Sequence, residues 1–358
     1  MPHFSPESWT PFTVTYSDRF KVIDTIPELL PPLISLMRMA RIKIQGRSAV
    51  YHCMSRVVGG QSLLDDVGKE KLVEILWQLA AFCGIEVITY CVMSNHFHVL
   101  VRVPQEQDPS DPELVERLEA LYGKKGLLVQ LARKGLADHG RVDKDIRQSM
   151  LERMGDVSAF MKELKQRFSR WYNRQTGRFG TLWAERFKSV LVEDQPGTVE
   201  TLAAYIDLNP VRAGLVNDPK DYRFCGYAEA LVGNRAAQAG LMSFQKDKVW
   251  KQAAAEYRKR LFVGAGRAGR SDKAVLDREE IKRVLAQGGE LSLAQILRLR
   301  VRHMTDGVVL GSKAFVNEIF ALHREKFGAK RQTGARPIRG VPLPGLSALR
   351  DLRVSAIS

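Results

Sequence analysis

Two histidines one residue apart, His96 and His98, lie in the apolar run HFHVLVRV. Alternate side chains of a strand point to the same face, so both imidazoles share a face with Leu100 and Arg102. The opposite face carries only apolar residues, Phe97, Val99, Val101 and Val103. Two imidazoles about 6.5 to 7 Å apart along a strand can bind one cation between them. The pair equally fits two half-exposed, hydrogen-bonded histidines, and a third ligand must come from elsewhere in the chain.

The segment AAYIDLNPVRAGLV supplies a candidate for that third ligand. Tyr205 and Asn209 are four residues apart, on one face of an expected helix that Thr198 can cap and Pro210 stops. The amide oxygen of Asn209 suits Mg²⁺ or Mn²⁺. The phenol of Tyr205 is a poor nucleophile at neutral pH, but a nearby divalent ion would polarise a target phosphate. The alternative interpretation is a half-buried aromatic residue and a helix cap.

Residues 160–190 combine many cations with aromatic residues. The cations are Lys162, Lys165, Arg167, Arg170, Arg174, Arg178, Arg186 and Lys188. The aromatic residues interleaved with them are Phe168, Trp171, Tyr172, Phe179, Trp183 and Phe187. Cations contact phosphates and aromatic rings stack on bases, so the segment predicts binding of single-stranded nucleic acid. The alternative is a solvated helix face whose aromatic residues belong to the core.

The composition favours the same class of partner. The chain has 358 residues and a formal net charge of +15, which favours nucleic acid or an anionic membrane surface. No apolar run reaches the roughly 18 residues that span a bilayer, and no basic-then-apolar leader is visible. The four scattered cysteines are expected to be reduced: Cys53, Cys83, Cys91 and Cys225. We therefore expect a cytoplasmic protein that binds nucleic acid and does not enter a membrane.

The elements that must position these residues follow a simple order. We expect a strand at 49–57, a helix ending at Gly84, a strand in IEVITYCVM and a hairpin turn at Ser94 and Asn95 before the histidine strand. A long basic helix then precedes a strand in TLWAERFKSVLVED. This β-α-β-β-α-β order predicts an α+β, ferredoxin-like fold, with an antiparallel sheet and helices on one face.

Composition changes divide the rest of the chain. We expect a poorly ordered extension at 1–38, a main domain at 39–232 and a helical insertion in it at about 104–150. A linker follows at 233–275, rich in Ala, Gly and Arg, and then a small helical domain at 276–328. The basic tail at 329–358 is expected to be disordered.

Several of these motifs occur together in one family. The chain resembles the HUH-type single-tyrosine transposases, the IS200-like group, and most closely their REP-associated tyrosine transposase branch. The matching pieces are VMSNHFHVLV, FMKELKQRFSRWYNRQTGRFGTLWAERFKSVLV, YIDLNPVRAGLV and YRFCGYAE. They stand in the family's order and cover roughly residues 41 to 230. The insertion at about 104–150 and the C-terminal region depart from the family pattern.

The resemblance implies a role for each matching residue. His96 and His98 match the metal ligands, Asn209 the third ligand and Tyr205 the nucleophile, whereas Tyr172, a rival nucleophile, does not match that position. The implied reaction is attack of Tyr205 on a phosphate of single-stranded DNA, giving a 5′-phosphotyrosine link and a free 3′-OH that can later rejoin a strand. The expected DNA is hairpin-bearing or a repetitive palindrome. The resemblance implies Mg²⁺ or Mn²⁺, although imidazole ligands suit Mn²⁺ or Zn²⁺ better than Mg²⁺.

The remaining expectations concern partners. The expected DNA-binding residues are all cationic: Arg102, Lys162, Lys165, Arg167, Arg170, Arg174, Arg178, Arg186, Lys188 and Arg212. We expect a monomer or homodimer associated with the nucleoid. Two other functions stay open at this point. One is a non-catalytic module that binds single-stranded or structured nucleic acid. The other is a metallohydrolase that activates water at the histidines, which the lack of an acidic cluster disfavours.

Overall fold

The computed structural model describes residues 41–44, 46–105, 108–245, 249–262, 303–328, 330–338 and 345–350. The predicted extension at 1–38, residues 263–275 of the predicted linker and residues 276–302 of the predicted helical domain lie outside this part of the chain, as do residues 329, 339–344 and 351–358 of the predicted tail. Within it, none of the helices is both long enough and apolar enough to cross a membrane.

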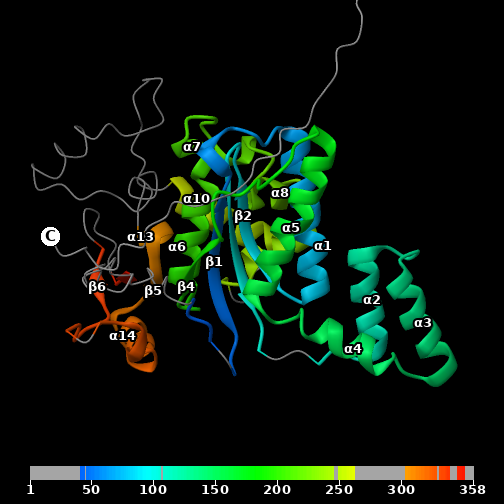
Figure 1. Ribbon diagram of the computed structural model, residues 1–358. Coiled ribbons are helices and arrows are strands. Elements are labelled where there is room, and N and C mark those ends of the chain that lie inside the picture. Colours follow the sequence, from blue (N-terminus) through cyan, green and yellow to red (C-terminus); the bar gives the residue numbers. More distant parts are fainter. Residues whose placement is uncertain are drawn as a thin grey trace, which may run out of the picture. The chain divides into compact units, whose positions relative to one another are not determined.

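A ferredoxin-like unit forms the centre of the molecule (Figure 1). Its elements are β1 (Ala49–Arg56), α1 (Asp66–Cys83), β2 (Glu86–Val92), β3 (His96–Val103), α5 (Val157–Thr176) and β4 (Lys188–Val192). The strands lie in the order β2-β3-β1-β4, and β1 pairs antiparallel with both β3 and β4. This is the strand order of a split β-α-β fold. The predicted fold class, mixed α+β with a sheet flanked by helices, is confirmed.

Local sequence explains where these elements begin and end. The Asp65 carboxylate accepts a hydrogen bond from the Gly68 N–H and caps α1, and Gly84 ends that helix with φ at 62°. Asp156 caps α5 by accepting from the Ala159 N–H at 2.7 Å. Between β2 and β3, the Met93 N–H donates to the His96 carbonyl and closes the predicted turn. The short β2–β3 connection therefore places the histidines at the start of a central strand.

The apolar face of β3 is buried on the side of the sheet that carries α5. The four side chains of this face are at most 6% exposed. The Phe97 ring lies 5.5 Å from the Trp183 ring, which lies 5.8 Å from Phe168 of α5. Because side chains alternate along a strand, this packing turns the histidines to the opposite face of the sheet.

That opposite face, which we call the histidine face, is also covered by helices. The covering region contains α6 (Pro196–Asp207), α7 (Asn209–Arg212), the 3₁₀ turn η2 (Pro219–Asp221), α8 (Gly226–Leu231), α9 (Arg235–Met242) and α10 (Trp250–Phe262). Figure 1 shows α6 and α10 on one side of the sheet and α1 and α5 on the other. The prediction of helices on one face thus holds for the ferredoxin-like unit, and the structure adds a second layer of helices. Two of these, α9 and α10, lie in the range 233–275 that was predicted to be a linker, and both bury apolar side chains.

The helix that carries Tyr205 begins and ends at residues other than the predicted ones. It begins at Pro196 with Gln195 as its N-cap, so Thr198 lies inside the helix, buried, and caps nothing. It ends at Asp207, because Leu208 has ψ at 2° and interrupts the helical geometry. Pro210 then lies in the first turn of α7, where its missing N–H does no harm.

The C-terminal region adds strands to the same sheet. It contains α13 (His303–Asp306), β5 (Gly307–Gly311), α14 (Lys313–Leu322), η3 (Arg324–Lys326), β6 (Arg336–Pro337) and β7 (Ser347–Arg350). β5 pairs parallel with β4, and β7 and β6 follow, so the sheet has seven strands. The helices α13 and α14 lie in the range predicted to be helical, but the strand β5 in that range and the paired strands in the predicted tail were not expected.

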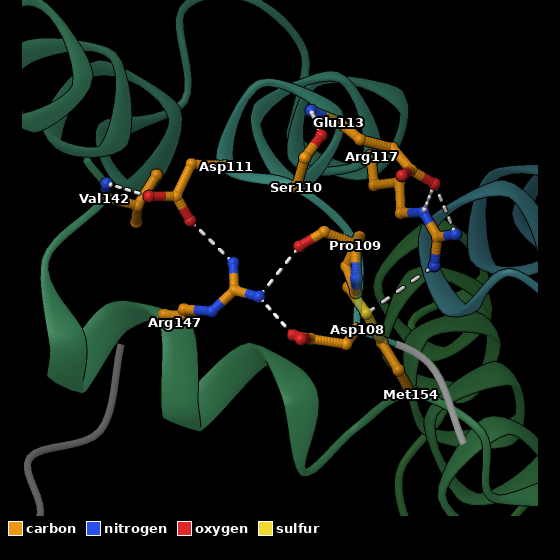
Figure 2. A network of polar contacts seen from close by, with 9 residues as sticks. All are labelled: Asp108, Pro109, Ser110, Asp111, Glu113, Arg117, Val142, Arg147 and Met154. Atoms are coloured by element: carbon orange, nitrogen blue, oxygen red, sulfur yellow. Dashed lines mark hydrogen bonds and ion pairs between the residues drawn. The ribbon is translucent and has the colours of Figure 1, made fainter. Parts of the chain in front are cut away.

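The insertion forms helices, as its composition indicated. They are α2 (Asp111–Tyr122), α3 (Leu127–His139) and α4 (Lys144–Leu151). Arg147 of α4 is the centre of a polar network (Figure 2). Its guanidinium donates to the Asp111 carboxylate at 2.6 Å, to the Pro109 carbonyl at 2.8 Å and to Asp108. Asp111 also accepts from the Val142 N–H at 2.8 Å, so the network joins the start of α2 to α4 and the loop before it.

Candidate functional site

The predicted histidines meet a third histidine on the histidine face. His52 of β1 is completely buried, His98 is 5% exposed and His96 is half-buried. The His52 Nε2 and His98 Nδ1 atoms are 2.9 Å apart, and the His96 and His98 ring centroids are 5.2 Å apart. His96 Nδ1 lies 2.6 Å from Asn95 Oδ1. The structure therefore brings the two predicted imidazoles together at the end of β3 and adds His52 beneath them.

Burial keeps the two inner imidazoles neutral. Desolvation lowers the pKa of His52 to about 4, although its backbone hydrogen bond to Met304 opposes this shift. Desolvation, followed by the neighbouring His52 and His96 rings, lowers the pKa of His98 well below its ordinary value. Neutral imidazoles retain a lone pair, which is the form that binds a metal ion.

Tyr205 lies on α6, one of the helices that cover the histidine face, and the guanidinium of Arg212 stacks on its ring. Its side chain is 2% exposed, and the Arg212 guanidinium lies 3.9 Å from its ring centroid. Arg212 also donates to the Tyr205 carbonyl at 2.6 Å, so it both stacks on the ring and closes the end of α6.

The helix of Tyr205 packs against the histidine strand, because α6 contacts both β2 and β3. The charge of Arg212, in α7, also lowers the pKa of His52 and of His98, although desolvation is the largest cause in each case.

Asn209 is the first residue of α7 and is 9% exposed. The interruption at Leu208 separates it from the helix of Tyr205, so the two residues do not share one continuous helix face. Among the described residues, no cluster of three or more His, Cys, Asp or Glu side chains could hold a metal ion. The predicted ligand set is not such a cluster, because its third member is an amide.

The rival nucleophile Tyr172 has a structural partner. It is 8% exposed, and its hydroxyl donates to the Leu63 carbonyl at 2.9 Å. This bond ties α5 to the loop before α1, which accounts for a tyrosine at this position without any chemistry.

The basic segment separates into a buried and an exposed set. Four of its aromatic residues belong to the core: Phe168, Tyr172, Trp183 and Phe187. Phe179 is 94% exposed and lies in the loop after α5. Exposed cations of the segment are Lys162, Arg170, Arg174, Arg186 and Lys188. Arg178 is half-buried.

The C-terminal end of α5 lies at the same end of the sheet as His96. The Leu64 N–H donates to the Ser94 carbonyl, and the Ala184 N–H donates to the carbonyl of Arg56, the residue opposite His96 in β1. Together with the bond from Tyr172 to Leu63, these contacts place exposed cations and Phe179 beside the histidine end of the sheet.

At least five of the predicted DNA-binding cations already have protein partners. Lys188 pairs with Glu185 and Asp306, and Arg212 donates to the Tyr205 carbonyl; the other three are Arg102, Arg167 and Lys165. Arg102 donates to the Asp194 carboxylate through two nitrogens, each at 2.9 Å, and pairs with Glu86. Arg167 pairs with Glu163 at 2.7 Å. Lys165 donates to the Glu185 carbonyl at 2.7 Å, and burial lowers its pKa to about 8. These contacts reduce the charge that each can offer to a phosphate.

Comparison with known proteins supports the class suggested by the motifs. Residues 47–124 match the model of the family described as "Transposase IS200 like". This segment runs from β1 through the histidine strand into the insertion, so the resemblance to IS200-like transposases is confirmed there.

A solved structure of a REP-associated tyrosine transposase bound to a REP hairpin also matches. It is 14% identical to this chain, covers 54% of this chain and 84% of its own, and has a TM-score of 0.33. A likeness of this size assigns no role to individual residues. No curated protein sequence matches the chain.

His52 is the residue of this site that sequence reasoning missed. It lies in the predicted first strand, but its relation to His98 depends on the register between β1 and β3. In that register Met54 is opposite His98 and Leu100 is opposite His52, which makes the two histidines diagonal neighbours. The only sequence signal was a histidine in the strand expected to lie beside the histidine pair.

Proposed function

We propose that the protein cleaves and rejoins single-stranded DNA through a covalent bond to Tyr205, as the IS200-like match suggests. The observation that carries this proposal is the packing of the Tyr205 helix α6 against β2 and β3 on the histidine face. The proposed substrate is hairpin-bearing or palindromic DNA. Exposed cations and Phe179 at the same end of the sheet would bind the backbone and stack on bases.

The proposed reaction balances without an external energy source. The Tyr205 oxygen forms a bond to phosphorus, loses its proton, and the bond to the 3′ oxygen breaks. That oxygen gains a proton and becomes the free 3′-OH. In the reverse direction, a 3′-OH attacks the phosphotyrosine and restores a phosphodiester. In this proposal the Arg212 guanidinium, 3.9 Å from the centre of the Tyr205 ring, would stabilise negative charge that develops on the phenol oxygen.

The donor set fits a divalent cation. His96 and His98 offer imidazoles on one face, and Asn209 offers an amide oxygen from α7. Imidazole and amide donors suit Mn²⁺, and Mg²⁺ less well. When bound, such an ion polarises the scissile phosphate and stabilises the charge that develops on it.

The test is to incubate the protein with Mn²⁺ and 5′- or 3′-labelled hairpin single strands. We expect an adduct that survives denaturation and carries the label located 3′ of the cut. Tyr205→Phe should abolish it, whereas Tyr172→Phe, which removes only a structural hydrogen bond, should retain it. No adduct with the wild type, or an equal adduct with Tyr205→Phe, would exclude this chemistry. Hairpin binding that is unchanged by EDTA and never followed by cleavage would instead support the non-catalytic alternative.

A further inference from the structure

His52 lies between the backbone carbonyl of Met304, in the C-terminal region, and the ring of His98, a proposed metal ligand. Its Nδ1 atom is 2.8 Å from the Met304 carbonyl oxygen, and its Nε2 atom is 2.9 Å from His98 Nδ1. The His52 side chain is completely buried, and its ring stacks on that of His98 with centroids 5.1 Å apart. Both ring nitrogens of His52 are therefore used inside the protein.

The Met304 carbonyl fixes the donor and acceptor of both hydrogen bonds. A backbone carbonyl can only accept, so the His52 Nδ1 carries the hydrogen and donates to Met304. A neutral imidazole has one N–H, so the His52 Nε2 must be an acceptor. His98 Nδ1 then has to be the donor, which leaves the lone pair of His98 on Nε2. A metal ion needs a ring nitrogen without a hydrogen.

From this chain of bonds we propose that His52 is a positioning residue that holds His98 in the tautomer presenting Nε2 to a divalent cation. This inference rests on the proposed function, because it assumes that His98 is a metal ligand. His52 itself touches neither the cation nor DNA. Outer partners of this kind orient the ring of a metal-ligating histidine and fix its tautomer.

The C-terminal region supplies the anchor of this arrangement. Met304 belongs to α13, its side chain is completely buried, and the adjoining strand β5 pairs with β4 through Leu191 with Val309 and Val192 with Leu310. Met304 lies far outside residues 47–124, which match the family model. The structure thus gives this region a role at the histidine site.

A comparable bond orients the other histidine. The Asn95 amide nitrogen donates to the Gly60 carbonyl at 3.0 Å, which turns Asn95 Oδ1 towards His96 Nδ1 at 2.6 Å. Since that oxygen only accepts, His96 also donates through Nδ1. Both imidazoles are therefore oriented by a hydrogen bond from the same ring atom, Nδ1.

The experiment compares two amide substitutions at His52 in the full-length, DNA-free protein. In His52→Asn the amide nitrogen can replace Nδ1 and keep the bond to Met304, but the acceptor for His98 is lost. In His52→Gln the longer side chain can place an oxygen near the position of Nε2 and restore that acceptor. Titration calorimetry with MnCl₂ measures the dissociation constant. We expect His52→Asn to raise it about 10- to 100-fold, and His52→Gln to recover most of the affinity.

Two further variants make the result decisive. Val101→Ala removes a completely buried side chain from the same strand on the opposite face, so it should lower the unfolding temperature in EDTA and leave Mn²⁺ affinity unchanged. His98→Ala should abolish Mn²⁺ binding. Wild-type affinity in His52→Asn, with binding lost in His98→Ala, would overturn this inference and leave the proposed function intact. Wild-type affinity in His98→Ala would remove the metal site and the inference together.

Discussion

Asp207, the last residue of α6, is a carboxyl group completely buried beside the histidine face. Its Oδ1 atom accepts from the Thr89 hydroxyl at 2.9 Å and the Tyr227 N–H at 3.3 Å, and its Oδ2 atom accepts from the Tyr257 hydroxyl at 2.6 Å. Thr89 lies on β2 and Tyr257 on α10. The single carboxyl therefore joins the sheet to the helices that cover it and fixes the end of the Tyr205 helix.

The Asp207 carboxyl should make the free energy of unfolding fall as pH rises, which is the opposite of the usual effect of a carboxyl group. Desolvation raises the pKa of Asp207 from 3.8 to about 7, although its hydrogen bonds oppose the shift. Between about pH 4 and 7 the folded protein thus holds a proton that the unfolded chain releases. The contribution of Asp207 to the free energy of unfolding should fall as pH rises through this window, by up to about 1.4 kcal/mol per pH unit. Asp207→Asn should remove that slope, as measured by urea unfolding at a series of pH values.

Asp218→Asn is the matched control for this experiment. Desolvation would raise the pKa of Asp218, but hydrogen bonds from Arg258 and the Lys220 N–H outweigh it, and the pKa is lowered. Its contribution to stability is lost as pH falls through that lowered pKa, so the variant should change the profile at the acidic end with the opposite sign. Parallel profiles for wild type and Asp207→Asn would show that Asp207 does not titrate in this window.

The helix α9 approaches β2 so closely that only glycine fits at position 240, where the two elements meet. A Cβ atom at Gly240 would lie 2.2 Å from the Val87 carbonyl oxygen and 2.8 Å from that of Ile88. Both obstacles are backbone atoms of a strand, so they cannot rotate away. We expect Gly240→Ala to lower the free energy of unfolding by about 1–3 kcal/mol, measured by urea denaturation.

Gly197, in the first turn of α6, provides the comparison. A Cβ atom there would meet no heavy atom within 4 Å. Gly197→Ala should therefore change stability by less than about 1 kcal/mol, and in the stabilising direction because alanine favours helix. Equal effects of the two substitutions would contradict the close contact between α9 and β2.

The helical insertion should depend on Arg147 (Figure 2). Arg147→Met keeps much of the side-chain length but removes the bonds to Asp108, Pro109 and Asp111. Hydrogen bonds to charged groups contribute about 1.5–3 kcal/mol each when buried, and less here because Asp108 is largely exposed. We expect amide hydrogen exchange in α2 and α4 to accelerate at least about 10-fold, while exchange in β1 and β3 stays unchanged.

Arg133→Met tests whether any lost ion pair has this effect. Arg133 pairs with Glu119 from a half-exposed position on α3. We expect little change in exchange, since surface pairs contribute about 0–1 kcal/mol. Acceleration of the same size in both variants would mean that the network around Arg147 has no special role.

The sequence could predict long, regular elements and could not predict pairings between distant ones. The expected strand at 49–57 is found at Ala49–Arg56, and the helix expected to end at Gly84 does so. Periodicity and capping residues act locally, so they are visible in a single stretch. The strand β5 has five residues, too few for a pattern, and it becomes a strand because β4 offers it an edge. The partnership of His52 with His98 likewise depends on register, which no local stretch of the sequence contains.

At the scale of the whole molecule, the net charge of +15 is less informative than its distribution. The cations on α5 divide between residues engaged inside the protein, such as Arg167 with Glu163, and residues exposed to solvent, such as Lys162, Arg170 and Arg174. Only a cation that can replace counterions at a phosphate contributes to the salt dependence of DNA binding. The exposed set should therefore carry the electrostatic part of the affinity.

Titration of hairpin-bearing single strands at several salt concentrations should separate these two groups of cations. The logarithm of the association constant falls linearly with the logarithm of salt concentration, with a slope of about −0.7 per phosphate contacted on a single strand. Replacing Lys162, Arg170 or Arg174 by Gln should each make the slope shallower by about that amount. Arg102→Gln is the control, because Arg102 already pairs with Asp194 and Glu86. If Arg102→Gln flattens the slope as much as Arg170→Gln does, the ion pairs of Arg102 open on binding and the DNA extends along the whole histidine strand. If the three α5 variants keep the wild-type slope, the DNA does not lie along this helix.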